Sequence, residues 1–430
     1  MRVLVVGNGG REHALVWKIR MSPLVRDVFC APGNAGIAAL ADCVPIETSH
    51  IVELADFAQQ TGIDLTVIGP ELPAVLGLAD EFQRRGLSVF GPTRAAAELE
   101  GSKAFAREFM RRHGIPGPRY AIVRSLEEAQ ALISKGELGW PLVLKMDALA
   151  AGKGVVVAQD AGEALATAAR MLGERRAGAA AVKLVLEECL EGEEVSFLAF
   201  SDGARVVPLV SSQDHKRVFD GDRGPNTGGM GTVSPATQIS VELHKQILQE
   251  IVVPTVAGMA AEGRRYQGVL YAGLMLTSAG PRVLEFNARF GDPEAQVILA
   301  RLRSDVVPLL RGVADGHLPE GPIEWAKEAA ACVVLASRGY PDTPETGKPI
   351  TGLEQLESLP DVAVFHAATA RRDGQLVSVG GRVLGITALG DSLELAVQRA
   401  YESAAKVSFE GMHYRRDIGQ RALARLHSAS

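Results

Sequence analysis

Short apolar runs that end at glycine or proline dominate the first hundred residues. The runs cover residues 3–6, 25–29, 65–68 and 87–90, and helical patterns of apolar residues lie between them. Short strands that alternate with helices form parallel sheets. We therefore predict a parallel α/β domain over residues 1–101. Ligands of such sheets bind beyond the carboxyl ends of the strands, so the small-residue turns there mark the expected binding edge.

The pattern changes after residue 101 to a mixture of strands and helices. We expect a helix from about 102 to 113 and a turn-rich linker at 113–118, and later a long helix near 241–263. A polar, glycine-rich segment at 211–235 interrupts the pattern. The strands are expected over 141–145, 154–158, 181–187, 194–199, 268–277 and 282–287. We assign this α+β region to a second domain, residues 102–320.

A second linker near residues 318–322 introduces the last part of the chain. Strands are expected over 332–337, 362–367, 377–379 and 381–387, with a helix near 392–406. This predicts a small α+β domain over residues 321–430. The fold class is therefore α/β combined with α+β.

Composition narrows the classes of protein that fit. The 430 residues suggest about three domains. The net charge of −6 argues against nucleic acid as a partner. The four cysteines are scattered without C-x-x-C spacing, which argues against a zinc site or a disulfide framework. No apolar run is long enough for a signal peptide or a membrane span, so we expect a cytoplasmic protein with no membrane partner.

Two glycine-rich turns are candidates for phosphate binding. Gly7-Asn8-Gly9-Gly10 follows the first strand, but Glu12 replaces the third glycine of a dinucleotide fingerprint. Backbone N–H groups at the start of a helix still suit a phosphate; the alternative is a tight turn without a ligand. The second turn follows Lys145, and Gly152-Lys153-Gly154 lacks the hydroxyl residue of a P-loop. Lys145 ends an apolar strand, where its charge costs free energy unless an anion meets it; the alternative is a solvated lysine.

Two groups of acidic and amide side chains are candidates for nucleotide and metal binding. Glu187 and Glu194 bracket a turn between two strands, although acidic runs of this kind are also common in solvated loops. Glu285 and Asn287 alternate on a strand and so share one face of the sheet. Oxygen donors side by side suit Mg²⁺ that also binds substrate phosphates. Arg289 follows on the same face and suits a carboxylate or a phosphate; a strand-end salt bridge is the alternative.

Together these features resemble the ATP-grasp superfamily, in which two α+β lobes clamp ATP. The order is Lys103, Lys145, a glycine-rich flap, the glutamates of the turn, then Glu285 and Asn287. Longer motifs are similar to the phosphoribosylamine–glycine ligase family, also called glycinamide ribonucleotide synthetases. They lie in order along essentially the whole chain, at residues 7–14, 31–36, 101–103, 212–217, 224–231, 287–294, 380–383 and 416–419.

The resemblance implies a ligase that forms a C–N bond in de novo purine biosynthesis. The implied reaction joins glycine to 5-phosphoribosylamine with ATP and Mg²⁺ or Mn²⁺, through glycyl phosphate, giving glycinamide ribonucleotide, ADP and phosphate. The implied fold is a Rossmann-like N-terminal domain, a two-lobed ATP-grasp core with a mobile small lobe at about 118–195, and a small C-terminal domain. We expect small-molecule partners only, and a monomer or a weak dimer.

The resemblance also assigns roles to residues. ATP contacts go to Lys103, Lys145, Glu187, Glu188, Leu190 and Glu194, and the metal to Glu285 and Asn287. The catalytic group is Lys145, Asp214, Lys216, Arg289 and Asp292. The contacts to phosphoribosylamine are Asn8, Gly9, Gly10, Asn34, Glu71 and Arg289. A lid is expected at residues 224–231.

Some positions depart from the family pattern. Met146 and Ala148 replace a small residue and a glycine, so Met146 should face either the adenine pocket or the adjacent core, and the backbone of Ala148 should avoid positive φ. The strand at 271–275 carries no acid, so the metal depends on Glu285 and Asn287.

Two other functions stay open: an ATP-grasp enzyme that uses bicarbonate, and a nucleotide-binding module without catalysis.

Overall fold

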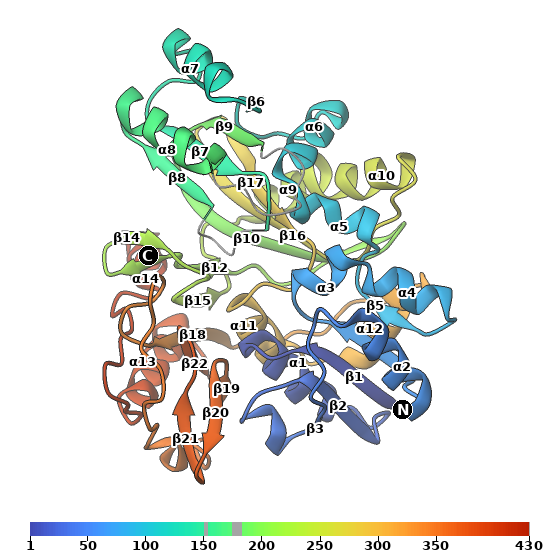
Figure 1. Ribbon diagram of the computed structural model, residues 1–430. Helices are drawn as coiled ribbons and strands as arrows, with labels where there is room; N and C mark the ends of the chain where they lie inside the picture. Colours follow the sequence, from blue (N-terminus) through green and yellow to red (C-terminus); the bar gives the residue numbers. More distant parts are fainter. Residues whose placement is uncertain (150–153, 174–182, 430) are drawn as a thin grey trace.

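The computed structural model describes residues 1–149, 154–173 and 183–429. The flap expected around Lys153 lies outside these residues, as does the start of the strand expected at 181–187. The chain forms an N-terminal parallel sheet, a central region of two sheets and a C-terminal sheet (Figure 1). This mixed α/β and α+β architecture confirms the predicted fold class.

The N-terminal sheet is parallel and has the order β3-β2-β1-β4-β5. The central strand β1 pairs on both sides, with Val5 opposite Cys30 and Val67. The turns after β1, β2 and β4 therefore share one edge of the sheet, as parallel strands require. The elements are β1 (Arg2–Gly7), α1 (Gly10–Arg20), β2 (Asp27–Pro32), β3 (Asp42–Cys43), α2 (Ile51–Thr61), β4 (Leu65–Ile68), α3 (Glu71–Leu76), α4 (Leu78–Arg84) and β5 (Val89–Phe90).

The central region contains a sheet of four antiparallel strands in the order β11-β10-β16-β17, which we call the large lobe. The long helix expected near 241–263 is α9, a π-turn at Leu248–Val252 and then α10. The other elements are α5 (Arg94–Gly101), α6 (Lys103–His113), β10 (Glu193–Asp202), β11 (Val206–Pro208), α9 (Val241–Ile247), α10 (Val253–Ala261), β16 (Gln267–Thr277) and β17 (Gly280–Asn287).

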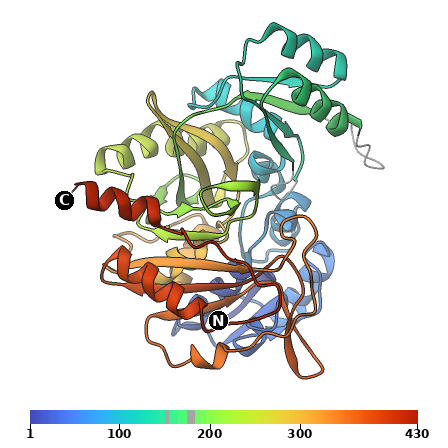
Figure 2. The ribbon, with the colours of Figure 1, turned by 90° about the vertical axis from the view of Figure 1, so that its left-hand side faces the viewer.

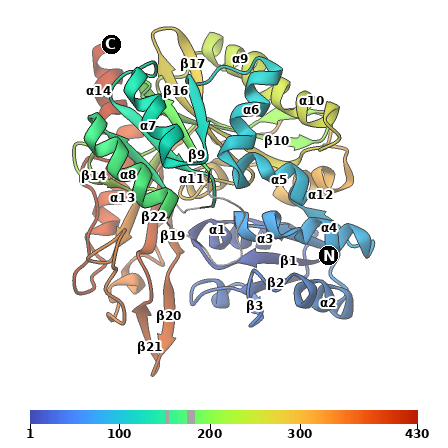
Figure 3. The same ribbon diagram turned by 45° about the horizontal axis from the view of Figure 1, so that its top comes forward.

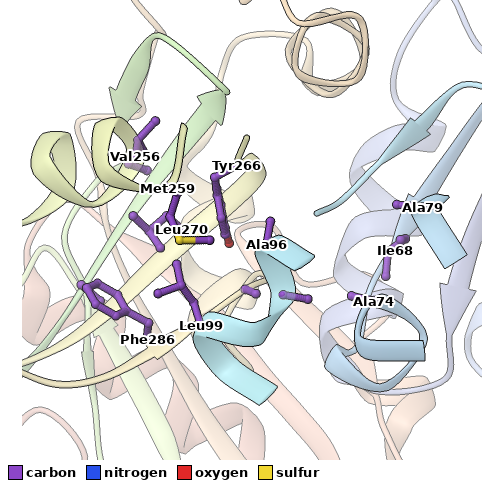
Figure 4. Close-up of a cluster of buried hydrophobic side chains, with 14 of the residues drawn as sticks. Ile68, Ala74, Ala79, Ala96, Leu99, Val256, Met259, Tyr266, Leu270 and Phe286 are labelled. Carbon is purple, nitrogen blue, oxygen red and sulfur yellow. The ribbon is translucent and has the colours of Figure 1, made fainter. Parts of the chain in front are cut away.

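Helix α5 joins the N-terminal domain to the large lobe through a shared hydrophobic core. Figure 4 shows Ala96 and Leu99 of α5 beside Tyr266 and Leu270, with Ile68 of the N-terminal domain on the other side. All five side chains are buried. Burial of apolar surface contributes about 25 cal/mol per Å². The continuous core therefore stabilises one arrangement of these two parts.

The small lobe is an antiparallel sheet, β6-β9-β7-β8, that extends away from the rest of the molecule (Figure 2). Helices α7 and α8 cover one of its faces (Figure 3). Met146 is buried in the core between this sheet and its helices and not in the cavity described below. The elements are β6 (Tyr120–Val123), α7 (Leu126–Lys135), β7 (Leu142–Met146), β8 (Val155–Ala158), α8 (Ala161–Gly173) and β9 (Leu184–Glu188).

The C-terminal sheet has the order β12-β15-β18-β22-β19 and takes strands from two distant parts of the sequence. Strands β12 (Gln213–Asp214) and β15 (Gly231–Ser234) come from the polar, glycine-rich segment, and β15 pairs with β18 (Ala329–Ala336). The division of the chain at residue 320 stays a prediction. The sheet nevertheless crosses this division, because β12 and β15 precede residue 320 and the other three strands follow it. Val233 of β15 is buried with residues of the C-terminal part.

The remaining elements complete this sheet or pack against it and against neighbouring parts of the molecule. No helix in the described part of the chain is both long enough and apolar enough to cross a membrane. Two hairpins, β13–β14 and β20–β21, stand apart from the main sheets. The elements are β13 (Arg217–Phe219), β14 (Arg223–Asn226), α11 (Glu294–Arg301), α12 (Val306–Asp315), β19 (Val362–His366), β20 (Thr369–Arg372), β21 (Gln375–Ser378), β22 (Arg382–Gly390), α13 (Leu393–Ala404) and α14 (Gln420–Ala429).

Candidate active site

A single cavity of about 840 Å³ collects residues from all parts of the chain. It receives side chains from the N-terminal domain, both lobes of the central region and the C-terminal sheet. Asn8, Gly9, Gly10 and Asn34 are not among its lining residues. The predicted site residues that line it are Glu71, Lys103, Lys145, Glu187, Glu188, Leu190, Glu194, Asp214, Lys216, Glu285, Asn287, Arg289 and Asp292.

The turn Asn8-Gly9-Gly10 lies at the margin of the cavity, where α1 begins. The N–H of Gly9 donates to Glu12 Oε2 at 2.7 Å, which orders the turn. Asn34 Nδ2 donates to the carbonyl oxygens of Asn8 and His366 at 2.9 and 2.8 Å. The amide of Asn34 thus orders loops within the protein. A methyl group placed on Gly9 would lie 3.5 Å from Asp292 Oδ2, so the turn adjoins the cavity wall.

Lys145 is buried at the end of β7 and contacts an acidic partner. Its Nζ lies 2.8 Å from Glu187 Oε2 and donates to the carbonyl oxygen of Leu284 at 2.9 Å. Burial lowers the pKa of Lys145, although Glu187 opposes the shift. Glu187 is only 2% exposed, and Arg107 donates to both of its carboxylate oxygens at 2.6 and 2.9 Å. Both carboxylate oxygens of Glu187 are therefore engaged by cations, and its backbone lies in β9 between β6 and β7.

Sequence reasoning did not place Arg107 in the site. The available signal was its spacing, because Arg107 follows Lys103 by four residues and so shares its face of α6. Lys103 Nζ donates to the carbonyl oxygen of Ala148 at 2.9 Å, at the start of the flap. Among the described non-glycine residues, positive φ occurs only at Asp222, Asp361 and Asp373, so the backbone of Ala148 avoids it as expected.

Glu285 and Asn287 lie on β17 and both line the cavity. Lys216 Nζ donates to Glu285 Oε1 at 3.2 Å and is the main cause that lowers the pKa of Glu285 to about 2. Asn287 Oδ1 accepts from Arg289 Nη2 at 3.2 Å. Across the described residues, no group of three or more His, Cys, Asp or Glu is arranged for a metal. The charged carboxylate and the amide oxygen fit a divalent cation whose other ligands come from phosphate and water.

Arg289 connects this strand to the N-terminal domain through two carboxylates. Arg289 Nε donates to Glu71 Oε2 at 3.0 Å, and Nη2 lies 2.9 Å from Glu100 Oε1. Burial, followed by the negative charge of Glu71, raises the pKa of Glu100 to about 7, against the effect of Arg289. Burial also opposes ionisation of Glu71, but Arg289 and Arg11 lower its pKa to about 2. The guanidinium of Arg289 therefore pairs with two carboxylates. The family resemblance predicts Glu71 as a site residue but not Glu100.

Asp214 and Glu294 form a second acidic group in the cavity wall. Asp214 Oδ1 accepts from the N–H of His215 at 2.7 Å. Burial and the nearby charge of Glu294 raise the pKa of Asp214 well above its usual range. Glu294 Oε1 accepts from Tyr271 Oη at 2.6 Å and from Ser196 Oγ at 2.9 Å. Two carboxylates near each other, one buried and one half-buried, favour a bound cation or a shared proton.

The C-terminal sheet reaches the cavity through Arg382. Its guanidinium donates to Asp292 Oδ2 at 2.9 Å, to the Asp292 carbonyl at 2.6 Å and to the Gly228 carbonyl at 2.7 Å. The N–H of Gly228 donates to Tyr340 Oη at 2.9 Å. The glycine-rich segment at 224–231 is therefore held by the C-terminal part of the chain, and Arg382 and Tyr340 both line the cavity.

Three family models match the chain in sequence. They are described as the phosphoribosylglycinamide synthetase N domain, residues 1–100, the ATP-grasp (A) domain, residues 101–295, and the C domain, residues 330–421. The phosphoribosylamine–glycine ligase of Halalkalibacterium halodurans is 49% identical over 424 residues, which are 99% of this chain and 98% of that protein. The ligase of the same name from Pseudomonas aeruginosa is 50% identical over 428 residues, 99% of each chain.

Solved structures also match the chain over nearly its whole length. The phosphoribosylamine–glycine ligase of Thermotoga maritima matches with a TM-score of 0.83 and 37% identity, over 97% of this chain and 100% of that one. The biotin carboxylase domain of the Hydrogenobacter thermophilus 2-oxoglutarate carboxylase matches with a TM-score of 0.75 over 96% of this chain and 91% of that one. That domain is only 18% identical, so its likeness concerns the fold alone.

Proposed function

The chain belongs to the phosphoribosylglycinamide synthetase family, and from that premise we propose that its cavity joins glycine to 5-phosphoribosylamine with ATP. The carboxylate of glycine takes the γ-phosphoryl group of ATP and releases ADP. The amine of phosphoribosylamine then attacks the acyl carbon of glycyl phosphate, and phosphate leaves with the bonding electron pair. The products are glycinamide ribonucleotide, ADP and phosphate, a step of de novo purine synthesis.

One observation carries the proposal: cationic and metal-binding groups share a single cavity with an N-terminal binding edge. Lys103, Lys145, Glu285 and Asn287 face the same 840 Å³ space as Glu71 of the N-terminal domain. Phosphoryl transfer needs positioning and charge neutralisation more than covalent catalysis. A cavity of this composition supplies both, and the reaction needs no nucleophilic cysteine.

In this proposal the nucleotide lies between the two lobes. Lys103 and Lys145 bind its phosphates, and its adenosine part is held by Glu187, the backbone of residues 188–190, and Glu194. Glu285 and Asn287 would hold a divalent cation, Mg²⁺ or Mn²⁺, which supplies charge neutralisation to the phosphate oxygens. The low pKa of Glu285 supports this role, because the carboxylate is ionised at every working pH.

The two other substrates occupy the side of the cavity toward the N- and C-terminal domains. Asp214 and Lys216 lie near glycine, and Arg289 and Asp292 lie near the reacting groups. The turn Asn8-Gly9-Gly10, with Asn34 and Glu71, holds phosphoribosylamine. Residues 224–231 cover the cavity and exclude water, which would hydrolyse an acyl phosphate.

The proposal is tested by phosphate release from Mg-ATP, with phosphoribosylamine generated in the assay, with and without glycine. We expect release only when both substrates are present, with glycinamide ribonucleotide as the product. Release that depends on bicarbonate and not on glycine would replace the proposal with a carboxylating ATP-grasp enzyme. ATP binding without release under either pairing would indicate a binding module.

A further inference from the structure

Arg107 belongs to a buried ionic cluster that the proposed reaction does not itself assign. The cluster consists of the guanidinium of Arg107, the ammonium of Lys145 and the carboxylate of Glu187, all of them buried. Arg107 binds Glu187 through both carboxylate oxygens, and Lys145 Nζ lies 2.8 Å from Glu187 Oε2. Two cations therefore share one anion. The carboxylate of Glu285 also acts on Lys145 electrostatically.

The same arginine connects the two lobes. Arg107 lies on α6, and Glu187 lies at the end of β9 in the small lobe. On the other side Arg107 Nη1 and Nη2 donate to the carbonyl oxygens of Val283 and Leu284 on β17, at 3.0 and 2.6 Å. Leu284 directly precedes the metal-binding Glu285. Arg107 thus holds β9 of the small lobe against β17 of the large lobe, the strand that carries Glu285.

The partners of Lys145 decide what happens when this lysine binds a phosphate. Its ammonium contacts Glu187 and the Leu284 carbonyl, and a phosphate competes for the same three protons. Without Arg107, movement of Lys145 toward a phosphate would leave Glu187 as a buried carboxylate with no counter-charge, which is costly. The bidentate contact from Arg107 removes that cost, because Glu187 keeps a cation.

From this geometry we infer that Arg107 is a positioning residue for ATP: it neutralises Glu187 and so leaves Lys145 able to bind the nucleotide phosphates. The inference rests on the proposed role of Lys145 in the ligase reaction. It concerns ATP binding alone, so it can fail while the ligase reaction stands.

The inference predicts a coupling between Arg107 and Glu187 that a purely structural role would not produce. In Arg107→Met the lysine becomes the sole cation of Glu187, and we expect the Kd and the KM for Mg-ATP to rise about tenfold or more. The KM for glycine should change less than about twofold. In the Glu187→Gln background the carboxylate that pairs with Lys145 is absent, so Arg107→Met should then cost less than about twofold in ATP affinity.

The experiment is a double-mutant cycle on the full chain, with ATP affinity measured by calorimetric titration and KM values from phosphate release. Thermal unfolding of each variant reports folding separately. Arg111→Met is the matched control, because Arg111 lies on the same helix, is exposed and pairs with Glu108; ATP affinity should stay unchanged.

An equal loss of ATP affinity in both backgrounds, or no loss in a folded Arg107→Met variant, would overturn the inference. If Arg107→Met does not fold, Arg107→Lys decides. It loses the bidentate contact but keeps the charge. Because neutralisation of Glu187 requires only the charge, an ATP Kd within about threefold of wild type supports the inference, and a larger rise contradicts it. Because ATP binding is measured without glycine, the result does not depend on which second substrate the wild-type enzyme uses.

Discussion

Charged side chains in the cavity share partners instead of forming isolated pairs. Arg289 forms ion pairs with both Glu71 and Glu100, and Glu187 forms ion pairs with both Arg107 and Lys145. Removing one partner of a buried ion pair leaves the other charge without compensation, which costs about 3–5 kcal/mol. Substitution of a shared group therefore leaves two charges without their partner, whereas substitution of one of its partners leaves the shared group paired with the other.

Lys145→Ala tests this distinction between activity and stability. The variant leaves Glu187 with its bidentate contact to Arg107, so we expect a loss of about 1 kcal/mol in unfolding free energy. The ATP-dependent turnover should fall by about a hundredfold or more, because a group that stabilises phosphoryl transfer is missing. Phosphate release and urea denaturation measure the two quantities.

Lys135→Ala is the control for this prediction, because Lys135 is exposed at the end of α7. It should change neither turnover nor stability. Turnover of Lys145→Ala near that of the wild type would contradict the proposed contact with phosphate.

Glu100 should produce a pH dependence of stability. Its pKa is about 7 in the folded protein, against an ordinary value of 4.5, so the folded state binds its proton more tightly. The contribution of this proton to stability is complete below pH 4.5 and is lost as the pH rises through 7. It amounts to about 3 kcal/mol. Glu100→Gln has no such proton, so its stability relative to wild type should rise by about this amount between pH 4.5 and 7.

The measurement is the unfolding free energy of both proteins by urea denaturation across this pH range. Glu98→Gln on the same helix is the control, because Glu98 is 42% exposed in its pair with Arg264. The curve for this control should run parallel to that of the wild type. A parallel curve for Glu100→Gln would show that Glu100 titrates normally.

The loop between β14 and β15 shows how a short element can depend on glycine. Gly229 has φ +116°, and a Cβ placed there would lie 2.4 Å from Pro293 Cδ and 2.7 Å from Asp214 Oδ1. The loop backbone therefore approaches the acidic wall of the cavity more closely than any side chain would permit.

Gly229→Ala should consequently reduce turnover about tenfold or more, since small displacements in an active site are costly. It should also destabilise the protein by about 1 kcal/mol or more through the strained φ. Gly374→Ala separates the two effects, because Gly374 has φ +78° with open space around it, in the β20–β21 hairpin. We expect that control to lose stability but to keep kcat. Equal kcat values for both variants would argue against a close approach at Gly229.

The C-terminal part of the chain is integrated with the rest of the molecule. Strand β15 has β18 as a neighbour, and Arg382 reaches Asp292 and Gly228 in the cavity. A chain that ends at residue 328 would lose β18, one of the two neighbours of β15, and would expose Val233, which is buried.

We expect this truncated chain to lose ATP binding and part of its β structure, measured by calorimetric titration and circular dichroism. Removal of residues 427–430 leaves β18 and Arg382 in place and should preserve both properties. A truncated chain with the ATP affinity of the full protein would mean that the cavity forms without the C-terminal sheet.

Local patterns were sufficient for many of the helices and strands, and together with the family motifs they identified part of the cavity lining. The apolar runs at 3–6 and 65–68 became β1 and β4, because strand formation in a parallel sheet depends on short β-branched runs bounded by turn residues. Glu285 and Asn287 alternate on one strand and so point to the same face of the sheet, and both line the cavity. The long motifs identified the family, which the full-length relatives confirm.

Contacts between distant residues required the folded chain. Strands β12 and β15 span two and four residues, and β15 depends on pairing with β18 about a hundred positions later. Arg107 and Glu187 are 80 positions apart, and Arg289 and Glu71 are 218 apart. The periodicity of a segment reports which face is buried but carries no information on its distant partners. Packing of the N-terminal domain and the two lobes against one another decides which charges share a partner, and with it the pKa values of Glu71 and Glu100.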